Sequence, residues 1–336
     1  MANVTLEQLI QETAEQSTAA KLPKRRRKRV PLWSKLLLDV LAAAVLLCAF
    51  ALPHHVLPRT YAPLTPPSTE PAPEQPSDTS MGAKFAERFT ATVVQSENKY
   101  SSPNISLTVE KKTQGEGDKL ITYYVADIYI RTIECFQTAL AGNTYGKGIS
   151  EPFLDIATAH NAILAVSGDY YGRHYGPVIR NGVLYRDTTA SADVCVLYKN
   201  GVMKTFAKGT FNAGAEMQNG AWQAWSFGPE LLTAEGASKT RFNSSLTPKH
   251  PRCAIGYYEP GHYALVLVDG RKDGYSTGMT LTELSALFES MGCSAAYNLD
   301  GGRSAQMAYA NAMVNQPYKD GRDVSDILFI GEVAAK

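Results

Sequence analysis

Three aspartates stand where an apolar run of the sequence meets a glycine turn: Asp169 in AVSGDYYG, Asp269 in ALVLVDGRKDG and Asp300 in AAYNLDGGRSA. If these runs are strands, each carboxylate is held at the end of a rigid element, and the glycines let a ligand approach closely. Such carboxylates can serve as nucleophile, base or metal ligand. An isolated Asp-Gly pair is also common in hairpin turns, so the pattern alone leaves a structural role open.

Positive charge lies beside these turns, on four arginines: Arg252, Arg271, Arg303 and Arg322. Guanidinium groups stay charged and match the geometry of phosphate oxygens, so they could hold an anionic substrate. The run Asp300-Gly301-Gly302-Arg303-Ser304 indicates an anion-binding nest more than a tight hairpin, because two glycines follow a buried run. His174 lies just past the first turn and could face the same site. We therefore expect these residues to line one pocket.

The elements that would position these side chains predict an α+β domain with a mixed β-sheet and few helices. Alternating or β-branched apolar runs predict strands at 104–111, 120–130, 163–166, 252–258, 262–268, 295–299 and 327–330. Helices are expected at 152–162 and 280–291, the second with a capping box of Thr280 and Glu283. Asn-Gly pairs at 181–182 and 200–201 predict two hairpins. Residues 210–250, which include Trp222 and Trp225, predict a long functional loop.

The composition is typical of a folded protein. The 336 residues are 44% hydrophobic and 19% charged, which is too apolar for a disordered chain. The net charge of +1 gives no overall positive field, so we expect no nucleic-acid partner. No HExxH, EF-hand, Walker or GxSxG motif occurs, and no metal site is expected. The widely spaced Cys135, Cys195, Cys253 and Cys293 leave disulfides and buried thiols equally open.

The N-terminal part predicts a membrane anchor. Sixteen of the 17 residues from Leu36 to Leu52 are apolar, Asp39 being the exception, and a membrane helix needs about 20 such residues. The basic run 24–29 precedes it, which favours a cytoplasmic N-terminus and an extracellular C-terminal domain, with a cleaved signal peptide as the competing interpretation. The expected divisions are a cytoplasmic basic tail at 1–31, a signal anchor at 32–52, a Pro-rich linker at 53–82 and a domain at 83–336.

Taken together, these segments resemble the phosphodiester glycosidase family from about residue 85 to residue 333. The resemblance rests on ILAVSGDYYG, on HPRCAIGYY with the following VDGRKDG, on AAYNLDGGRSAQMAY, on WSFGPELL and on Arg322-Asp323-Val324. Two positions differ from the family's pattern. Ser167 stands where the family often has Asn, and Arg303 stands where it often has a third glycine.

The resemblance implies a glycosidase that hydrolyses a sugar-1-phosphodiester without a cofactor, in an envelope polysaccharide or glycopolymer. It implies a catalytic set of Asp300, Asp169 and Asp269, in which Asp300 and Asp169 supply the carboxylates as nucleophile or base and Asp269 supports Arg271. The expected substrate-binding residues are Arg252, Arg303, Gly301, Gly302, Asn298, Arg271, Ser304, Arg322 and His174. Two other functions remain open: a non-catalytic glycan-binding module of the same fold, and a metal-dependent phosphodiesterase with the three aspartates as ligands.

Overall fold

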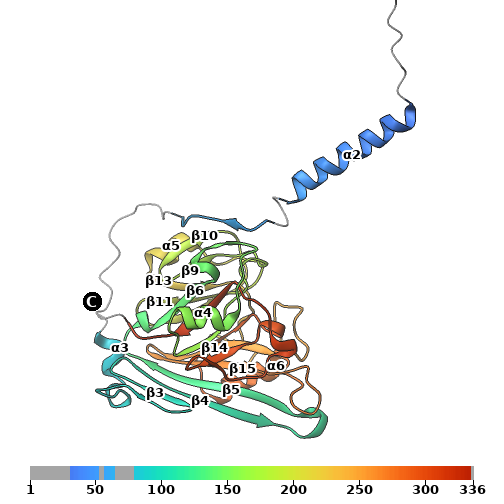
Figure 1. Cartoon of the computed structure of the whole chain (residues 1–336). Coiled ribbons are helices and arrows are strands. Elements are labelled where there is room, and N and C mark those ends of the chain that lie inside the picture. The colour runs from blue at the N-terminus through green and yellow to red at the C-terminus, as the bar shows by residue number, and fades with distance from the viewer. Residues whose placement is uncertain (1–30, 53–56, 65–78, 334–336) are drawn as a thin grey trace, which may run out of the picture. The chain divides into compact units, whose positions relative to one another are not determined.

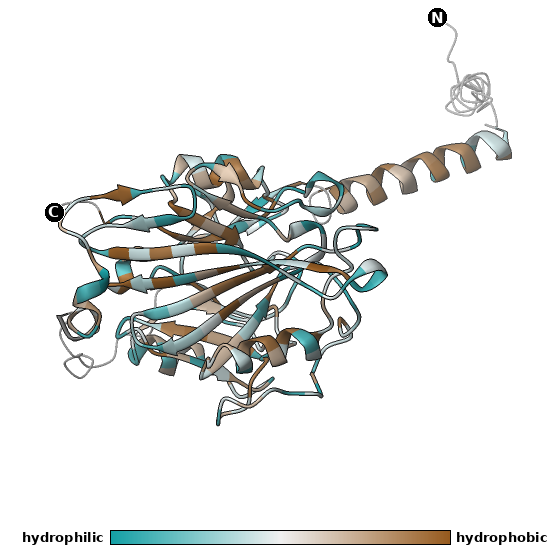
Figure 2. Cartoon of the chain, turned by 90° about the horizontal axis from the view of Figure 1, so that it is seen from below, coloured by the Kyte–Doolittle hydropathy of each residue, from teal (hydrophilic) through white to brown (hydrophobic). Residues whose placement is uncertain are grey.

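The computed structural model describes residues 31–52, 57–64 and 79–333, in two units, Met1–Leu57 and Pro58–Lys336. In the first unit, helix α2 (Leu32–Ala51) has 20 residues, none of them buried, and it is long and apolar enough to cross a membrane. Figure 2 shows the apolar character along most of its length. The expected basic tail lies outside the described residues apart from Pro31, so the orientation of α2 stays a prediction.

The second unit is built around a seven-stranded sheet with the order β16-β14-β15-β5-β4-β3-β2. Its strands are β2 (Val94–Gln95), β3 (Lys99–Ser101), β4 (Ile105–Gln114), β5 (Ile121–Ile130), β14 (Arg252–Glu259), β15 (His262–Val268) and β16 (Ala295–Leu299). The alternating Ile105, Leu107 and Val109 of β4 face one core, as expected. Strand β5 is apolar except for Thr122 and Asp127, because its alternate residues enter two different cores, one on each face of the sheet.

Two five-stranded sheets pack against the seven-stranded one. The first has the order β18-β17-β8-β19-β6 and the second the order β10-β9-β13-β11-β12. Their strands are β6 (Phe136–Leu140), β8 (Leu164–Ser167), β9 (Val178–Arg180), β10 (Val183–Arg186), β11 (Val194–Tyr198), β12 (Met203–Phe206), β13 (Ala221–Trp225), β17 (Met307–Tyr309), β18 (Ala312–Met313) and β19 (Asp326–Ile330). All three sheets contribute to one central core, which includes Leu265, Val166, Leu328 and Trp225.

Few helices cover these sheets, as Figure 1 shows. Helix α6 (Leu281–Ser290) packs Leu284 and Phe288 on the outer face of the seven-stranded sheet, and its predicted capping box of Thr280 and Glu283 is present. Helix α4 (Phe153–Ala159) covers the first five-stranded sheet, and α5 (Ala213–Gln218) covers the second. The other helices are α3 (Thr79–Ala83), η2 (Ala86–Arg88), η3 (Gly117–Lys119), η4 (Ile133–Cys135), η5 (Ala141–Asn143), η6 (Gly302–Ser304) and η7 (Tyr318–Asp320).

The α+β class is confirmed, and the strand pairs between described residues are antiparallel rather than mixed in direction. Both Asn-Gly hairpins are present, β9–β10 and β11–β12. The prediction of a long loop at 210–250 is wrong for its first part, because α5 and β13 lie there. Trp225 is fully buried on β13, and Trp222 donates its indole N–H to the Phe136 carbonyl oxygen (2.7 Å). The residues around β13 are polar and rich in glycine, so the sequence does not indicate a strand there, although β13 lies at the centre of its sheet.

The folded unit includes residues that the sequence assigns to the linker. Strand β1 (Arg59–Thr60) pairs with β7 (Gly146–Lys147), and the Leu64 amide donates to the Leu184 carbonyl oxygen (2.7 Å). Met81 is buried in the central core. Residues 58–64 therefore lie along the domain, and the expected boundary between 82 and 83 falls inside it. The four cysteines of this unit are buried and form no disulfide with one another.

Candidate active site

Asp300 directly follows strand β16, as the sequence predicts, and its carboxylate is partly open to solvent. Its side chain is 10% exposed, and its Oδ2 accepts a hydrogen bond from Arg322 Nη2 (2.7 Å). Burial raises the pKa of Asp300, while the charge of Arg322 lowers it. A narrow cleft beside Asp300 is lined by Ser167, Gly168, Tyr170, Val324, Ser325 and Asp326.

Arg322 connects Ser304 and Tyr170 to Asp300. Its Nε donates to Ser304 Oγ (2.5 Å), and its guanidinium lies 4.3 Å from the centre of the Tyr170 ring. His174 is close enough for its charge to lower the pKa of Asp300 as well. The structure therefore brings together four of the predicted site residues, namely Asp300, Ser304, Arg322 and His174.

Asp169 does not reach this cleft. It is fully buried, its Oδ1 accepts from Arg180 Nη2 (2.7 Å), and its Oδ2 accepts from the Ser226 amide (2.9 Å). The same Arg180 nitrogen contacts Asp326 Oδ2 at 2.9 Å, so one guanidinium lies between two carboxylates. We call Asp169, Arg180 and Asp326 the buried triad. Burial and the charge of Asp169 raise the pKa of Asp326, and Arg180 opposes this.

The buried triad explains the glycine before Asp169. A Cβ added at Gly168 would lie 2.5 Å from the Asp326 carboxylate, so no larger residue fits there without a shift. Asp326 also borders the narrow cleft, so it is the member of the triad that comes nearest to Asp300. The chain therefore has a second carboxyl group at this cleft, although a different one from that expected.

Asp269 belongs to a separate network of neutral donors. Its carboxylate accepts from Tyr275 Oη (2.8 Å), from Asn315 Nδ2 (2.7 Å) and from the Gln316 amide (3.0 Å). Burial raises the pKa of Asp269, and these hydrogen bonds lower it. It does not support Arg271 as expected, because Arg271 Nη2 instead contacts His250 Nδ1 (3.0 Å). Asp269 therefore holds the 315–316 segment.

Arg252 and Asn298 also have structural partners. The Arg252 guanidinium is buried and donates to three carbonyl oxygens, those of Met279 (2.9 Å), Leu246 (2.7 Å) and Pro248 (2.5 Å). Burial and the nearby Arg271 lower the pKa of Arg252 to about 10. Asn298 is buried and donates its side-chain N–H to the Gly228 carbonyl oxygen (2.8 Å). Neither residue lines the cleft beside Asp300.

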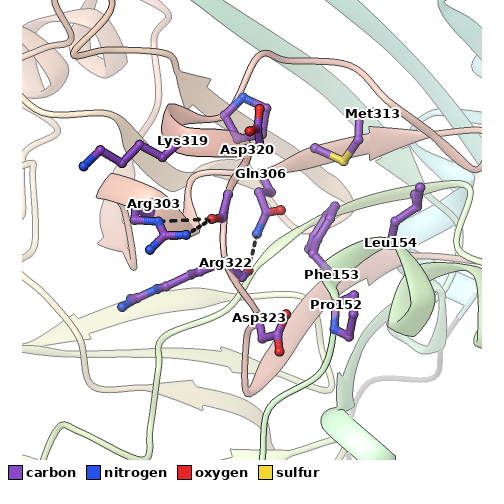
Figure 3. Close-up of a pocket in the computed structure, with 12 residues that line it drawn as sticks. Pro152, Phe153, Leu154, Arg303, Gln306, Met313, Lys319, Asp320, Arg322 and Asp323 are labelled. Carbon is purple, nitrogen blue, oxygen red and sulfur yellow. Dashed lines mark hydrogen bonds between the residues drawn. The ribbon is translucent and has the colours of Figure 1, made fainter.

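The expected anion nest is partly occupied by the chain itself. The Gly302 amide donates to the Pro251 carbonyl oxygen (2.9 Å), and a Cβ on Gly301 would lie 2.5 Å from the same oxygen. Arg303 points away from Asp300, because its Nε and Nη2 both donate to the Gly321 carbonyl oxygen (3.1 and 2.7 Å; Figure 3). These glycines therefore pack the 301–304 turn against the segment that precedes β14.

A pocket of about 600 Å³ lies on the other side of Arg322. Figure 3 shows Arg303, Lys319 and Arg322 directing their charged ends to one side of it and Phe153, Leu154 and Met313 lying on the other. Arg322 is thus shared between this pocket and the Asp300 carboxylate. Within the described parts of the chain, no group of three or more His, Cys, Asp or Glu side chains could hold a metal ion.

Comparison with known proteins places this site in a family. The model of the phosphodiester glycosidase family matches residues 160–331, which is half of the chain and contains the Asp300 cleft, the buried triad and the Arg322 turn. The chain belongs to the phosphodiester glycosidase family. The resemblance predicted from the sequence motifs is therefore confirmed.

Two similar proteins show how much of this chain the similarity covers. The SPbeta prophage-derived uncharacterized protein YomE of Bacillus subtilis (strain 168) is 29% identical over 272 residues, which cover 74% of this chain and 42% of that protein. The chain thus spans less than half the length of this relative. The zebrafish N-acetylglucosamine-1-phosphodiester alpha-N-acetylglucosaminidase catalytic domain, auto-inhibited by its pro-peptide, is 19% identical with a TM-score of 0.57. That match covers 80% of this chain and 97% of the zebrafish chain, and it supports the fold.

Three residues of this phosphodiester glycosidase site were not singled out from the sequence: Tyr170, Arg180 and Asp326. Arg180 ends the apolar run PVIR, and Asp326 begins the apolar run DILFI. A charged residue at the edge of an otherwise apolar strand is a usable signal, because burial there requires a partner of opposite charge. Tyr170 carries a different signal, a left-handed backbone with φ of 51°, which only the structure reveals.

Proposed function

We propose that the domain hydrolyses a sugar-1-phosphodiester by splitting the bond between the anomeric carbon and a phosphate oxygen. Membership of the phosphodiester glycosidase family supports a glycosidase-type hydrolase. The observation that carries the proposal is the Asp300–Arg322 pair. Its carboxylate and guanidinium lie 2.7 Å apart, the Asp300 side chain is 10% and the Arg322 side chain 33% exposed, and Arg322 also lines a pocket large enough for a substrate group.

The reaction develops positive charge on the anomeric carbon and negative charge on the departing phosphate. The Asp300 carboxylate is suited to the first charge, as nucleophile or as base for water, and Arg322 is suited to the second. In either case the water oxygen ends on the anomeric carbon, and the phosphate monoester leaves with the bonding electrons. Because phosphate is a good leaving group, the reaction needs little help from a general acid.

The pocket beside Arg322 is the proposed place for the group esterified to the phosphate. It is lined by the apolar Phe153, Leu154 and Met313 and by charged groups at the opposite side, and its volume of about 600 Å³ is typical of ligand sites. A leaving group seated there would bring its phosphate next to Arg322 and the anomeric carbon next to Asp300. This proposal places the aglycone in the pocket and the sugar on the Asp300 side of Arg322, where the narrow cleft has no room for a sugar ring as it stands and must widen to admit one.

The anchored, outward-facing arrangement is also a proposal. The 20-residue apolar helix α2 and the basic run 24–29 support a single span with the N-terminus in the cytoplasm, so that the domain would meet an envelope polysaccharide or glycopolymer. An epitope at the C-terminus of the full chain, probed with antibody on intact cells, tests this. We expect labelling without permeabilisation, and labelling only after permeabilisation would contradict it.

The test of the hydrolase is the Asp300→Asn variant of the full chain in detergent, assayed on a sugar-1-phosphate methyl diester. We expect turnover to fall by about 10³-fold or more, because the variant keeps the shape of the side chain and removes its charge. The matched control is Asp118→Asn, an exposed carboxylate on η3. Unchanged turnover would remove Asp300 from the reaction. Binding of the diester without cleavage by the unaltered protein would favour the glycan-binding alternative, and loss of turnover with a chelator would favour the metal-dependent one.

A further inference from the structure

Arg303 occupies a position where the phosphodiester glycosidases often have glycine, and its side chain does not face Asp300. Both Nε and Nη2 donate to one acceptor, the Gly321 carbonyl oxygen, at 3.1 and 2.7 Å (Figure 3). An arginine that commits two donors to one backbone oxygen fixes that part of the backbone in place. The backbone that Arg303 fixes is the one around Gly321.

Gly321 belongs to a turn with an unusual backbone. Lys319, Asp320 and Gly321 all have left-handed φ angles, of 52°, 56° and 79°. L-residues rarely adopt this conformation, so consecutive left-handed residues depend on their surroundings to persist. The surroundings here supply three donors: two from Arg303, and one from Gln306, whose Nε2 donates to the Arg322 carbonyl oxygen (2.9 Å).

The residue that follows this turn is Arg322, whose side chain returns to the turn that carries Arg303. Its Nε donates to Ser304 Oγ (2.5 Å) and its Nη2 to Asp300 Oδ2 (2.7 Å). The two turns, η6 and η7, therefore hold each other through two arginines that run in opposite directions. The position of the Arg322 guanidinium on Asp300 depends on where the 321–322 backbone lies.

We infer that Arg303 is a positioning residue, which holds the Gly321–Arg322 backbone so that the Arg322 guanidinium stays on the Asp300 carboxylate. This inference rests on the proposed function, in which Asp300 is the reacting carboxylate. It also replaces the expectation that Arg303 contacts the phosphate.

Four titratable or charged groups face Asp300 from different segments. They are Arg322 after η7, His174 after β8, Cys253 on β14 and Asp326 on β19. Of these, Arg322 directly follows Gly321, the residue that Arg303 holds. A change at Arg303 should therefore alter the ionisation of Asp300 through Arg322 and leave the other three contributions in place.

The experiment compares Arg303→Met, which removes every donor, with Arg303→Lys, which keeps the charge and one donor. Arg241→Met, at an exposed arginine, is the control. On the full chain in detergent we would measure kcat and KM against pH, and separately titrate the Asp300 carboxyl by ¹³C NMR, with its signal assigned through Asp300→Asn.

For Arg303→Met we expect kcat to fall roughly ten- to a hundredfold, because a misplaced charged group loses its effect on the reaction. The titration midpoint of Asp300 should rise by about one pH unit, since a loosened cation favours the ionised carboxylate less. KM should change by less than about threefold, because the loss lies mainly in the chemical step. Arg303→Lys should recover most of both changes.

A raised KM with an unmoved Asp300 titration would show that Arg303 contacts substrate, and no change in either would show an ordinary surface residue. Each result would overturn the inference. The NMR titration needs no turnover, so an unaltered protein without activity would count against the proposed function and still leave this test decisive. If Arg303→Met does not fold, Arg303→Gln, which keeps one amide donor without the charge, takes its place.

Discussion

Two clusters of carboxylate and guanidinium lie close together in this domain and differ in burial. In the buried triad, Arg180 lies between Asp169 and Asp326, and all three side chains are 2% exposed or less. In the Asp300–Arg322 pair, the side chains are 10% and 33% exposed. Both clusters include a carboxylate at or next to a strand end and have the same closest distance of 2.7 Å.

The difference in burial separates the structural role of the buried triad from the chemical role proposed for Asp300. In the buried triad, Asp169 accepts from Arg180 and from the Ser226 amide, and Asp326 accepts from Arg180 while bordering the cleft as a side chain that is only 1% exposed. In the Asp300–Arg322 pair, the carboxylate accepts from Arg322 at one oxygen, borders the same narrow cleft and keeps 10% of its side chain exposed. A carboxylate at a strand end is therefore a candidate for catalysis only when its burial leaves room for the reacting atoms.

The largest expected effect on stability comes from breaking the buried triad with Arg180→Met. Removal of the cation leaves two buried carboxylates without a counter-charge, and such a loss typically costs about 3–5 kcal/mol in the free energy of unfolding. Urea unfolding of the full chain in detergent measures it. The exposed Arg241→Met is the control and should change stability by less than about 0.5 kcal/mol.

The same variant has a pH dependence with a definite sign. Burial raises the pKa of Asp326 in the folded state, so the folded chain binds more protons than the unfolded chain, and stability falls as the pH rises above the ordinary carboxyl range. Arg180 limits this fall, because its charge favours the ionised form. The deficit of Arg180→Met should therefore be smaller at low pH than at neutral pH. A deficit that grows on acidification would contradict the role assigned to the buried triad.

Much of the fold follows from local patterns in the sequence. Alternation predicts β4, the capping box of Thr280 and Glu283 predicts the start of α6, and both Asn-Gly turns lie where expected. Strand β13 was missed, because the residues around it are polar and its burial depends on pairing with β9 and β11, which are distant in sequence. The packing of residues 58–64 on the domain was missed for the same reason.

The candidate site is predictable only in part. Asp300 was found because two glycines after a buried strand form an unusual signal. The burial of Asp169 cannot be predicted from the sequence, because it depends on Arg180 from β9 and Asp326 from β19, which only the fold brings together. Arg252 looked like a phosphate ligand, yet its donors go to three backbone carbonyl oxygens. Residue types at strand ends indicate where chemistry is possible, and burial decides where it occurs.

A substitution in the Asp300–Arg322 pair should change activity more than stability. Arg322→Gln removes the cation beside Asp300, and we expect kcat to fall by about 10²-fold, or ~2.7 kcal/mol, as for the loss of one donor to a developing negative charge. Because the charge of Arg322 lowers the pKa of Asp300, its removal raises that pKa further, and the acidic limb of the pH–rate profile should move to higher pH. Stability should fall by less than in Arg180→Met, since the Arg322 side chain is 33% exposed and the loss leaves one carboxylate without its cation rather than two.

Kinetics over a range of pH measure the change in kcat and in the acidic limb of the pH–rate profile. Urea unfolding of the same preparation measures the change in stability. Arg173→Gln, at an exposed arginine near the cleft, controls for a general loss of positive charge. A large loss of stability with unchanged kcat would place Arg322 in the same structural class as Arg180 and would remove the distinction between the two clusters.

The smallest expected effect concerns Asp269, the third aspartate at a strand end, which is buried like Asp169 but held by neutral donors. In Asp269→Asn one side-chain oxygen becomes an N–H₂ group, which faces either the donor Asn315 at Oδ1 or the donors Gln316 and Tyr275 at Oδ2. At least one hydrogen bond to a charged acceptor is therefore lost. We expect a loss of about 1–3 kcal/mol in the free energy of unfolding. At a temperature where the variant is folded, kcat should stay within about twofold of the unaltered protein, because Asp269 has no contact with the Asp300 cleft.

The comparison variant Tyr275→Phe removes one donor to the same carboxylate and should show a smaller loss of stability with the same unchanged kcat. A drop in kcat for Asp269→Asn, without a matching drop for Tyr275→Phe, would return Asp269 to the catalytic set and would show that sealing by neutral donors does not exclude a carboxylate from the reaction.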